Sequence, residues 1–257
     1  MKRICLFLCF ILFLTGCSSV TTGGSLLSYE ALPNKKSGWG FRRTENGPDF
    51  TSDQIRLMSE YDCIYKESGD EKAVYLTFDE GYENGYTAVI LDTLREKDVK
   101  AAFFVTGQFV KENPELIKRM ASEGHIIGNH SLSHPSLPEV SIEKLKSELL
   151  ELDRLVYGIC GVHTKFLRAP RGEYSERTLA ITRDMGYTNV FWSQAYVDWN
   201  NDVSAEDAFS SITSGLHSGC VLLLHAVAKG NADSLGRVID HARKEGYVFK
   251  SLCDYKK

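Results

Sequence analysis

The stretch AVYLTFDEGYENGYTAVILDTLRE, residues 73–96, decides the fold class. Its first six residues are rich in β-branched and aromatic side chains, which is typical of a buried strand. Two acidic residues and a glycine-rich turn follow. Apolar side chains then recur at Ala88, Ile90, Leu91 and Leu94, the spacing of one helix face. The stretch therefore predicts a strand followed by a helix, the unit from which parallel sheets are built.

The same alternation continues toward the end of the chain. We expect further strands at 101–106, 126–128, 166–168, 190–192, 221–224 and 247–250. We expect the helices between and after them at 113–122, 141–157, 175–185, 205–216 and 234–244. This pattern is typical of an α/β protein with either a parallel sheet or an α/β barrel. In both architectures the active site lies at the carboxyl ends of the strands, so polar residues that follow strands become the candidates.

Composition narrows the class of protein further. The chain has 257 residues, with 30 Lys and Arg against 34 Asp and Glu and a formal net charge of −4. This balance argues against a strongly basic nucleic-acid binder, so we expect no nucleic-acid partner. The hydrophobic content of 43% is too high for a mostly disordered chain.

The first residues have the features of a secretory signal. Lys2 and Arg3 precede an apolar run at 4–14, which is too short to span a bilayer comfortably. The sequence from Leu14 to Cys17 resembles the lipobox of bacterial lipoproteins, which implies cleavage after residue 16 and lipid on Cys17. The alternative is an ordinary signal in which Cys17 is incidental. We expect an extracytoplasmic protein, lipid-anchored to the cell membrane.

We divide the chain into a signal peptide at 1–16, a lipidated cysteine and flexible tether at 17–37, an extension at 38–71 and a catalytic domain at 72–252. Four cysteines lie beyond Cys17, at Cys63, Cys160, Cys220 and Cys253. Four cysteines in an extracytoplasmic chain allow three pairings, among which the sequence does not choose. Cys220 lies in an apolar run and is interpreted as a core thiol.

Two groups of residues suggest metal-assisted chemistry. Asp79 and Glu80 follow the first predicted strand and could supply one base and one metal ligand, or simply form a solvated acidic turn. His130 and His134 are four residues apart, so they can face the same way on a helical turn and chelate a cation. Two histidines with a carboxylate suit Zn²⁺ or another borderline cation.

Other polar residues also follow predicted strands. Arg168 could orient a carboxylate by a bidentate contact, and Arg171 follows in the turn RAPRG. Asp198-Trp199 precedes the last cluster, Leu223-Leu224-His225. His225 at a strand end is a candidate general acid, although a lone histidine is more often structural.

Taken in order, these five clusters resemble the motifs of the polysaccharide deacetylases of carbohydrate esterase family 4, the NodB homology domain. Residues 81–87 and 38–41 are similar to the branch that acts on muramic acid during delta-lactam synthesis. The resemblance implies a distorted (β/α) barrel with a short N-terminal extension. It also implies a metal-dependent hydrolase, with Zn²⁺ as the expected metal, that removes the N-acetyl group of a peptidoglycan amino sugar, N-acetylmuramic acid.

The resemblance also implies individual roles. Asp79 would be the general base and His225 the general acid, with Arg168 holding Asp79 and Asp198 tuning the acid. Trp199, Leu223 and Arg171 would contact substrate, and His130, His134 and Glu80 would bind the metal. Glu80 departs from the aspartate usual in the family, so it either ligates the metal or points away and leaves two histidines and waters.

Two other functions stay open. One is deacetylation of N-acetylglucosamine in peptidoglycan or another glycan, and the other is a non-catalytic glycan-binding lipoprotein. The five retained polar residues argue against the second, because binding alone does not require all of them: Asp79, His130, His134, Arg168 and His225.

Overall fold

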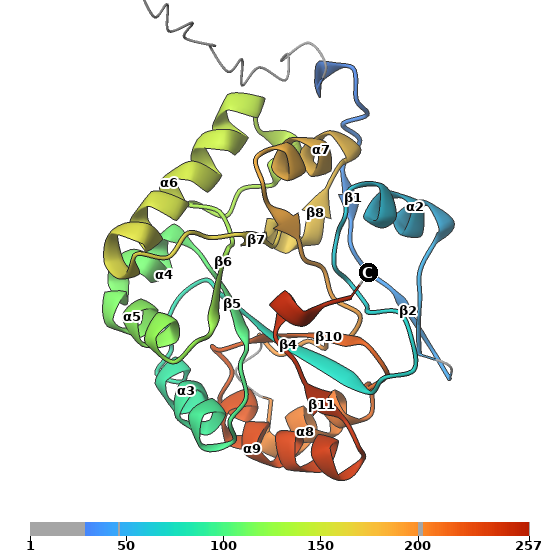
Figure 1. Cartoon of the computed structure of the whole chain (residues 1–257), viewed down its shortest axis with the longest axis vertical. Coiled ribbons are helices and arrows are strands. Elements are labelled where there is room, and N and C mark those ends of the chain that lie inside the picture. The colour runs from blue at the N-terminus through green and yellow to red at the C-terminus, as the bar shows by residue number, and fades with distance from the viewer. Residues whose placement is uncertain (1–28, 46, 200–202, 257) are drawn as a thin grey trace, which may run out of the picture.

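A computed structural model describes residues 29–45, 47–199 and 203–256 (Figure 1). The predicted signal at 1–16 and Cys17 lie outside the described residues, as does part of the predicted tether. Within the described ranges, no helix is both long and apolar enough to cross a membrane.

A parallel sheet forms the centre of the molecule. Its strands run in the order β10 (Cys220–His225), β4 (Ala73–Glu80), β5 (Ala102–Val105), β6 (Ile126–Asn129), β7 (Phe166–Leu167) and β9 (Thr188–Asn189), with β11 (Val248–Phe249) also paired to β4. All eight residues of β4 are buried. A strand buried on both faces needs no polar alternation, which explains the nearly continuous apolar run at its start.

The sheet curls until its two edges approach each other. Isolated bridges join Ile64 to Val190, Lys66 to Cys220 and Gln194 to Leu222, so residues near β9 and β10 are linked partly through the segment before β4. The helices lie outside the curled sheet (Figure 1). This is the distorted (β/α) barrel that the resemblance implies, with one side closed by single bridges instead of a full strand pair.

The outer helices are α3 (Thr87–Glu96), α4 (Gly107–Glu112), α5 (Pro114–Ser122), α6 (Ile142–Cys160), α7 (Glu176–Asp184), α8 (Ala205–Thr213) and α9 (Lys229–Lys244). The sequence pattern missed α4, which begins where the Thr106 hydroxyl accepts a hydrogen bond from the Phe109 amide at 3.3 Å. It also placed the start of α9 at Ser234, although the helix begins at Lys229.

The prediction of a strand at 190–192 was wrong, because the regular strand β9 ends just before this segment. The backbone of this segment has other partners. The Val190 and Phe191 carbonyls accept hydrogen bonds from the Arg168 guanidinium at 3.1 and 3.4 Å. The Phe191 amide donates to Ile64. The backbone groups of this segment therefore bind Arg168 and close the barrel, and they are not available for a regular strand pair.

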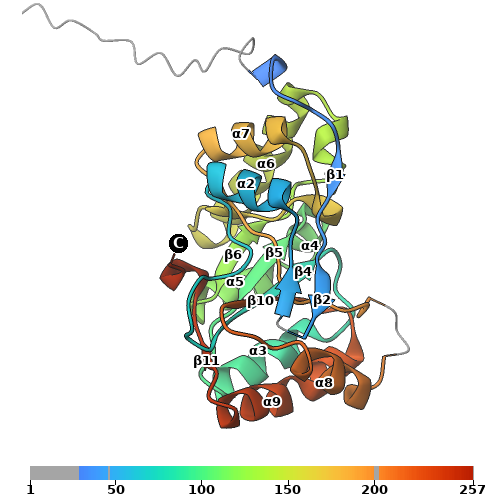
Figure 2. The ribbon, with the colours of Figure 1, turned by 90° about the vertical axis from the view of Figure 1, so that its right-hand side faces the viewer.

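The N-terminal extension packs along one side of the barrel (Figure 2). It contains β1 (Ser37–Gly38), the hairpin of β2 (Arg42–Thr44) and β3 (Gly47–Asp49), and α2 (Ser52–Glu60). β1 pairs antiparallel with β8 (Glu173–Tyr174) of the barrel. Trp39 packs against Phe50 and Phe191, with ring centroids 5.3 and 4.7 Å apart, so extension and barrel share one apolar cluster.

Local hydrogen bonds fix the starts of two helices. Thr51 caps α2 in a reciprocal capping box with Gln54. Before α5, the side chain of Asn113 donates to the Phe109 carbonyl at 3.1 Å. Cys160, Cys220 and Cys253 are free thiols, and Cys220 is buried within β10, as interpreted from the sequence.

Candidate active site

The catalytic candidates Asp79 and His225 lie side by side at the carboxyl ends of neighbouring strands. They are register partners in the parallel pair formed by β4 and β10. Residues 146 positions apart in the sequence thus meet because both end a strand of the same sheet edge, as the strand-end argument predicts.

Arg168 holds Asp79 in a buried ion pair. Its Nη1 donates to Asp79 Oδ1 at 2.8 Å, and its guanidinium carbon lies 4.3 Å from the centroid of the Phe104 ring. Arg168 is fully buried and Asp79 nearly so. Burial alone would raise the pKa of Asp79, but the charge and the hydrogen bond of Arg168 oppose it, and that pKa lies below its usual value. Asp79 is therefore a carboxylate at neutral pH.

His130 is oriented by a backbone carbonyl. Its Nδ1 lies 2.8 Å from the Arg168 carbonyl oxygen, which can only accept, so Nδ1 carries the proton. Nε2 therefore presents its lone pair, 3.7 Å from Asp79 Oδ2. Burial lowers the pKa of His130 and lowers that of His134 to about 4, so both imidazoles are neutral at neutral pH. Neutral imidazoles are the form that binds metals.

The two histidines come together, but not on the helical turn that their spacing suggested. Their ring centroids are 4.9 Å apart. The intervening loop is bent, with Ser131 and His134 in the left-handed region at φ 65° and 58°. The Asn129 carboxamide oxygen accepts from the Ser131 amide at 2.9 Å, and the Ser131 hydroxyl accepts from the His134 amide at 3.0 Å.

Glu148 fixes this loop and was missed by the sequence analysis. Its two carboxylate oxygens accept hydrogen bonds from the amide and the hydroxyl of Ser133, both at 2.7 Å. Lys144 also pairs with it at 2.7 Å. A signal was present in the sequence, because Glu148 lies on the helix face that Leu145, Leu149 and Leu152 bury. An acidic residue on an apolar face needs a partner.

Glu80 does not join the histidines. No group of three or more His, Cys, Asp or Glu side chains in the described ranges is arranged to hold a metal, so the three-residue set with Glu80 does not form. Consecutive strand residues point to opposite faces of a sheet, and Asp79 takes the face of Arg168 and His130. Glu80 is fully buried, and neither carboxylate oxygen has a hydrogen-bond partner within the described residues.

The environment of Glu80 opposes a negative charge. Burial, with the nearby charges of Glu83 and Asp79, holds its pKa well above the usual value. The interpretation of an exposed acidic turn is wrong for both residues, because Asp79 and Glu80 are buried.

His225 and Asp198 form the second charged pair. His225 Nδ1 lies 2.7 Å from Asp198 Oδ1, and the His225 amide donates to Asp198 Oδ2 at 2.7 Å. Burial would lower the pKa of His225, but the hydrogen bond and the charge of Asp198 outweigh it, so this pKa is raised. The side chain of His225 is 26% exposed and that of Asp198 only 1%, so protons can reach the histidine.

Asn231 in α9 completes this pair and was also missed. Its carboxamide nitrogen donates to Asp198 Oδ2 at 2.6 Å and to the His225 carbonyl at 3.0 Å. Its carboxamide oxygen accepts a hydrogen bond from the Tyr196 hydroxyl. No motif in the sequence indicated this residue, since α9 was expected to start after it.

The three predicted substrate residues lie around these pairs. Trp199 is 59% exposed, and its ring meets the His225 ring edge-on at a centroid distance of 5.6 Å. Leu223 is buried two residues before His225, on the same face of β10. Arg171 is exposed in the turn Pro170–Gly172 at φ 60°, near enough to His134 to lower its pKa.

Comparisons with known proteins agree with this arrangement. A model of the family described as polysaccharide deacetylase matches residues 66–190. The chain is 44% identical over 243 residues to the peptidoglycan-N-acetylmuramic acid deacetylase PdaA of Bacillus subtilis, covering 93% of this chain and 92% of that protein. The chain belongs to the polysaccharide deacetylase family. The family predicted from the sequence motifs is thus confirmed.

Two further comparisons support the assignment to this family. The solved structure of Bacillus subtilis PdaA, described as a family 4 carbohydrate esterase, superposes with a TM-score of 0.85 and covers 87% of this chain and 98% of its own. A peptidoglycan-N-acetylglucosamine deacetylase of Bacillus cereus is 32% identical over 199 residues, which cover 76% of this chain and 72% of that protein. The predictions of a NodB-type barrel and of a hydrolase that cleaves an amide C–N bond are confirmed.

For a polysaccharide deacetylase, the geometry offers two proton-handling groups on adjacent strands. One is an ionised carboxylate and the other is a histidine with a raised pKa, and environments that separate two titrating groups in this way mark a base and an acid. A hollow of about 280 Å³ adjoins His134 and is lined by Gly81, Tyr82, Thr106, Gln108, Leu132, Ser133 and His134.

Proposed function

We propose that this protein removes the acetyl group from N-acetylmuramic acid in peptidoglycan glycan strands. The observation that carries the proposal is the pairing of Asp79 with His225 across β4 and β10, each held by its own charged partner. The 44% identity to a peptidoglycan-N-acetylmuramic acid deacetylase supports the same substrate here. This identity over nearly the whole chain makes peptidoglycan the expected polymer.

Asp79 is the general base in this proposal. It takes a proton from a water molecule as the water oxygen bonds to the acetyl carbonyl carbon. His225 then donates a proton to the nitrogen as the C–N bond breaks, so the products are acetate and a free amino sugar. Arg168 keeps Asp79 ionised, and Asp198 keeps His225 protonated.

The site fits a divalent cation on two ligands. His130 and His134 are neutral imidazoles with neighbouring rings, and His130 has a free Nε2. We propose that these two residues hold the metal, with Zn²⁺ as the expected ion, and that Glu80 does not. When bound, such an ion lowers the pKa of a water molecule and polarises an amide carbonyl.

The choice of sugar is proposed to rest on Arg171. Muramic acid carries a lactyl carboxylate that glucosamine lacks, and Arg171 is an exposed cation on the turn after Arg168. The alternative substrate is N-acetylglucosamine, which the identity of 32% to a deacetylase of that sugar favours. A binding protein without activity is the remaining alternative.

One experiment separates these functions. The purified protein is incubated with Zn²⁺ and with intact or peptide-stripped glycan strands, and the deacetylated residues are identified by mass spectrometry. Muramic acid in the product supports the proposal, and glucosamine supports the alternative substrate. The absence of any free amino sugar would leave only the binding function.

We also propose that the protein is anchored by lipid outside the cytoplasm. The support is the sequence from Leu14 to Cys17, which follows a basic residue pair and an apolar run. Two acyl chains on one cysteine give stable membrane attachment, whereas one chain does not. Labelling with a fatty acid tests this, since Cys17→Ala should abolish the label; equal labelling of both proteins contradicts it.

A further inference from the structure

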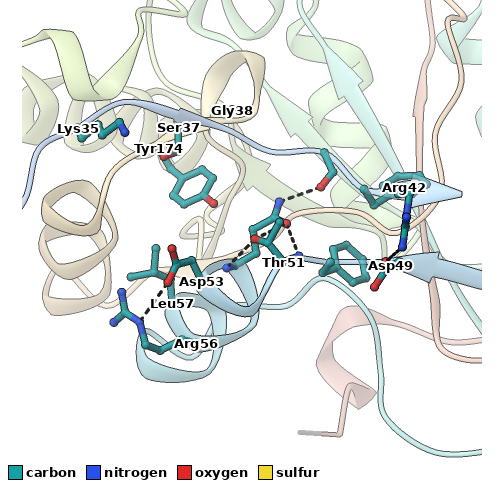
Figure 3. Close-up of a pocket in the computed structure, with 14 residues that line it drawn as sticks. Lys35, Ser37, Gly38, Arg42, Asp49, Thr51, Asp53, Arg56, Leu57 and Tyr174 are labelled. Atoms are coloured by element: carbon teal, nitrogen blue, oxygen red, sulfur yellow. Dashed lines mark hydrogen bonds and ion pairs between the residues drawn. The ribbon is translucent and has the colours of Figure 1, made fainter.

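A second hollow lies on the N-terminal extension and contains none of the catalytic residues. Its volume is about 830 Å³, within the range of roughly 300–1,000 Å³ found for ligand sites. It is bounded by β1, the β2–β3 hairpin and α2, with Tyr174 of β8 at its inner wall (Figure 3). We call it the extension pocket; its lining includes Lys35, Ser37, Phe41, Asp53, Gln54 and Tyr174.

Tyr174 presents an unpaired hydroxyl to the extension pocket. The residue is only 3% exposed, and its ring is fixed against Phe191 at a centroid distance of 5.2 Å. Figure 3 shows the hydroxyl pointing into the space between β1 and α2. Within the described ranges no hydrogen bond joins this hydroxyl to another residue, and it is not one of the buried polar atoms that lack a partner, so it is open to the pocket and can bond a ligand. Burial raises the pKa of Tyr174, so the hydroxyl keeps its proton and can donate.

The charges around the pocket are mixed and partly unused. Arg56 pairs mainly with Glu60, at 2.9 Å, and reaches Asp53 only at 4.0 Å. Lys35 has no ion pair among the described residues and lies at one end of the pocket (Figure 3). Donors and acceptors therefore line the same hollow, together with one spare positive charge.

Aromatic surface adds an apolar part to the lining. Phe41 is partly exposed and packs against Phe50 with ring centroids 6.1 Å apart. A sugar ring has an apolar C–H face and a hydroxyl-bearing rim, so it matches an aromatic surface flanked by polar groups. A polyanion matches less well, because Arg42 and Arg56 in the lining are already paired with Asp49 and Glu60, which leaves Lys35 as the one cation of the lining without an ion pair among the described residues.

The extension pocket also contacts the turn Pro170–Gly172, which follows Arg168. Tyr174 follows the turn that carries Arg168 and Arg171, and the Trp39 amide donates to the Gly172 carbonyl at 2.8 Å. A polymer held at the extension would therefore be attached to the same rigid piece of structure that positions Arg168.

We propose that the extension pocket binds a second segment of the peptidoglycan glycan strand, apart from the sugar being deacetylated. The Tyr174 hydroxyl and Asp53 hydrogen-bond the sugar, and Lys35 meets a muramoyl carboxylate. The proposal rests on the proposed function, because it assigns the same polymer to a second site. Its role is to keep a long strand on the enzyme between reactions.

Binding to insoluble peptidoglycan tests the proposal. Protein carrying Asp79→Asn, which prevents turnover, is sedimented with purified peptide-stripped strands of high molecular weight. Adding Tyr174→Phe or Lys35→Glu should weaken binding about three- to tenfold, the effect of one hydrogen bond or ion pair. The matched controls Tyr157→Phe and Lys244→Glu alter exposed residues of α6 and α9 and should not change it. The melting temperature of Tyr174→Phe should equal that of the parent, since the hydroxyl has no partner to lose.

A second measurement separates this proposal from the proposed function. With Asp79 intact, the two pocket variants should deacetylate short soluble oligosaccharides at the parental rate, because such substrates do not need the second site. Sedimentation of the pocket variants at the level of the controls would overturn the extension pocket alone. Binding that disappears when anionic phosphate polymers are removed from the wall preparation would assign the pocket to those polymers and overturn the glycan. A parent protein that deacetylates no oligosaccharide would instead overturn the proposed function.

Discussion

The two charged pairs of the active site differ in how far they are closed to water. Arg168 is fully buried beneath Asp79 and is held by two backbone carbonyls and an aromatic ring. His225 keeps 26% of its side chain exposed, and its partner Asp198 is held by an amide and by Asn231. The first pair fixes a charge, and the second supports a group that must exchange protons. The following predictions test that contrast.

Removing the base should have the largest effect on activity. Asp79→Asn keeps the size of the side chain but cannot accept a proton, and general base catalysis contributes about 100- to 10,000-fold. We expect the turnover number on oligosaccharides to fall within that range while the circular dichroism spectrum is unchanged. Asp92→Asn, at a half-exposed residue of α3 that pairs with Arg95 and Arg119, is the control. Parental turnover in Asp79→Asn would remove Asp79 from the mechanism.

Breaking the closed pair should have the largest effect on stability. Arg168→Ala leaves a buried carboxylate without its cation, which costs about 3–5 kcal/mol of unfolding free energy. Chemical denaturation measures this value. If the loss comes from the stranded charge, the double variant Asp79→Asn with Arg168→Ala recovers part of it. A double variant no more stable than Arg168→Ala would assign the loss to packing alone.

Weakening the open pair should move the pH profile. His225 must be protonated to act as the acid, so activity is lost as pH rises through its pKa, which Asp198 holds above the usual value. Asp198→Asn removes that support, and the alkaline limb of turnover should move to lower pH. The control Asp153→Asn alters a similar pair, in which His163 Nδ1 lies 2.8 Å from Asp153, and should leave the limb in place. An unmoved limb in Asp198→Asn contradicts the assignment.

Asn231 should have the smallest effect, because it acts through Asp198. Asn231→Ala removes three hydrogen bonds, one of them to the Asp198 carboxylate, and we expect turnover to fall about tenfold. The KM should stay constant, and the alkaline limb should shift in the same direction as in Asp198→Asn. A higher KM with an unshifted limb would mean that Asn231 serves the binding surface and not the acid.

The sequence predicted those parts of the site that follow from strand order. The runs ending at Asp79 and His225 are almost entirely apolar, so both strands were evident, and in a parallel pair their ends were expected at one sheet edge. For Glu80 the sequence left two alternatives, a metal ligand or a side chain that points away, and the alternation of neighbouring strand residues favours the second. The role of Asn231 could not be predicted, because its partner Asp198 lies 33 residues away and no local sequence pattern connects the two residues.

The contact between Trp39 and the turn Pro170–Gly172 links the N-terminal extension to the folding of the active site. Gly172 adopts φ +65°, and a Cβ there would lie 2.7 Å from the Trp192 ring and 3.3 Å from Trp39, so no side chain fits at this position beside the packed tryptophans. Trp39 also donates to the Trp192 carbonyl, and the two residues are 153 positions apart. Contacts between distant parts of a chain form late, because a long loop must close first. We therefore expect the turn after Arg168 to reach its final shape only once the N-terminal extension has docked, so that a chain without the extension loses the geometry around Arg168.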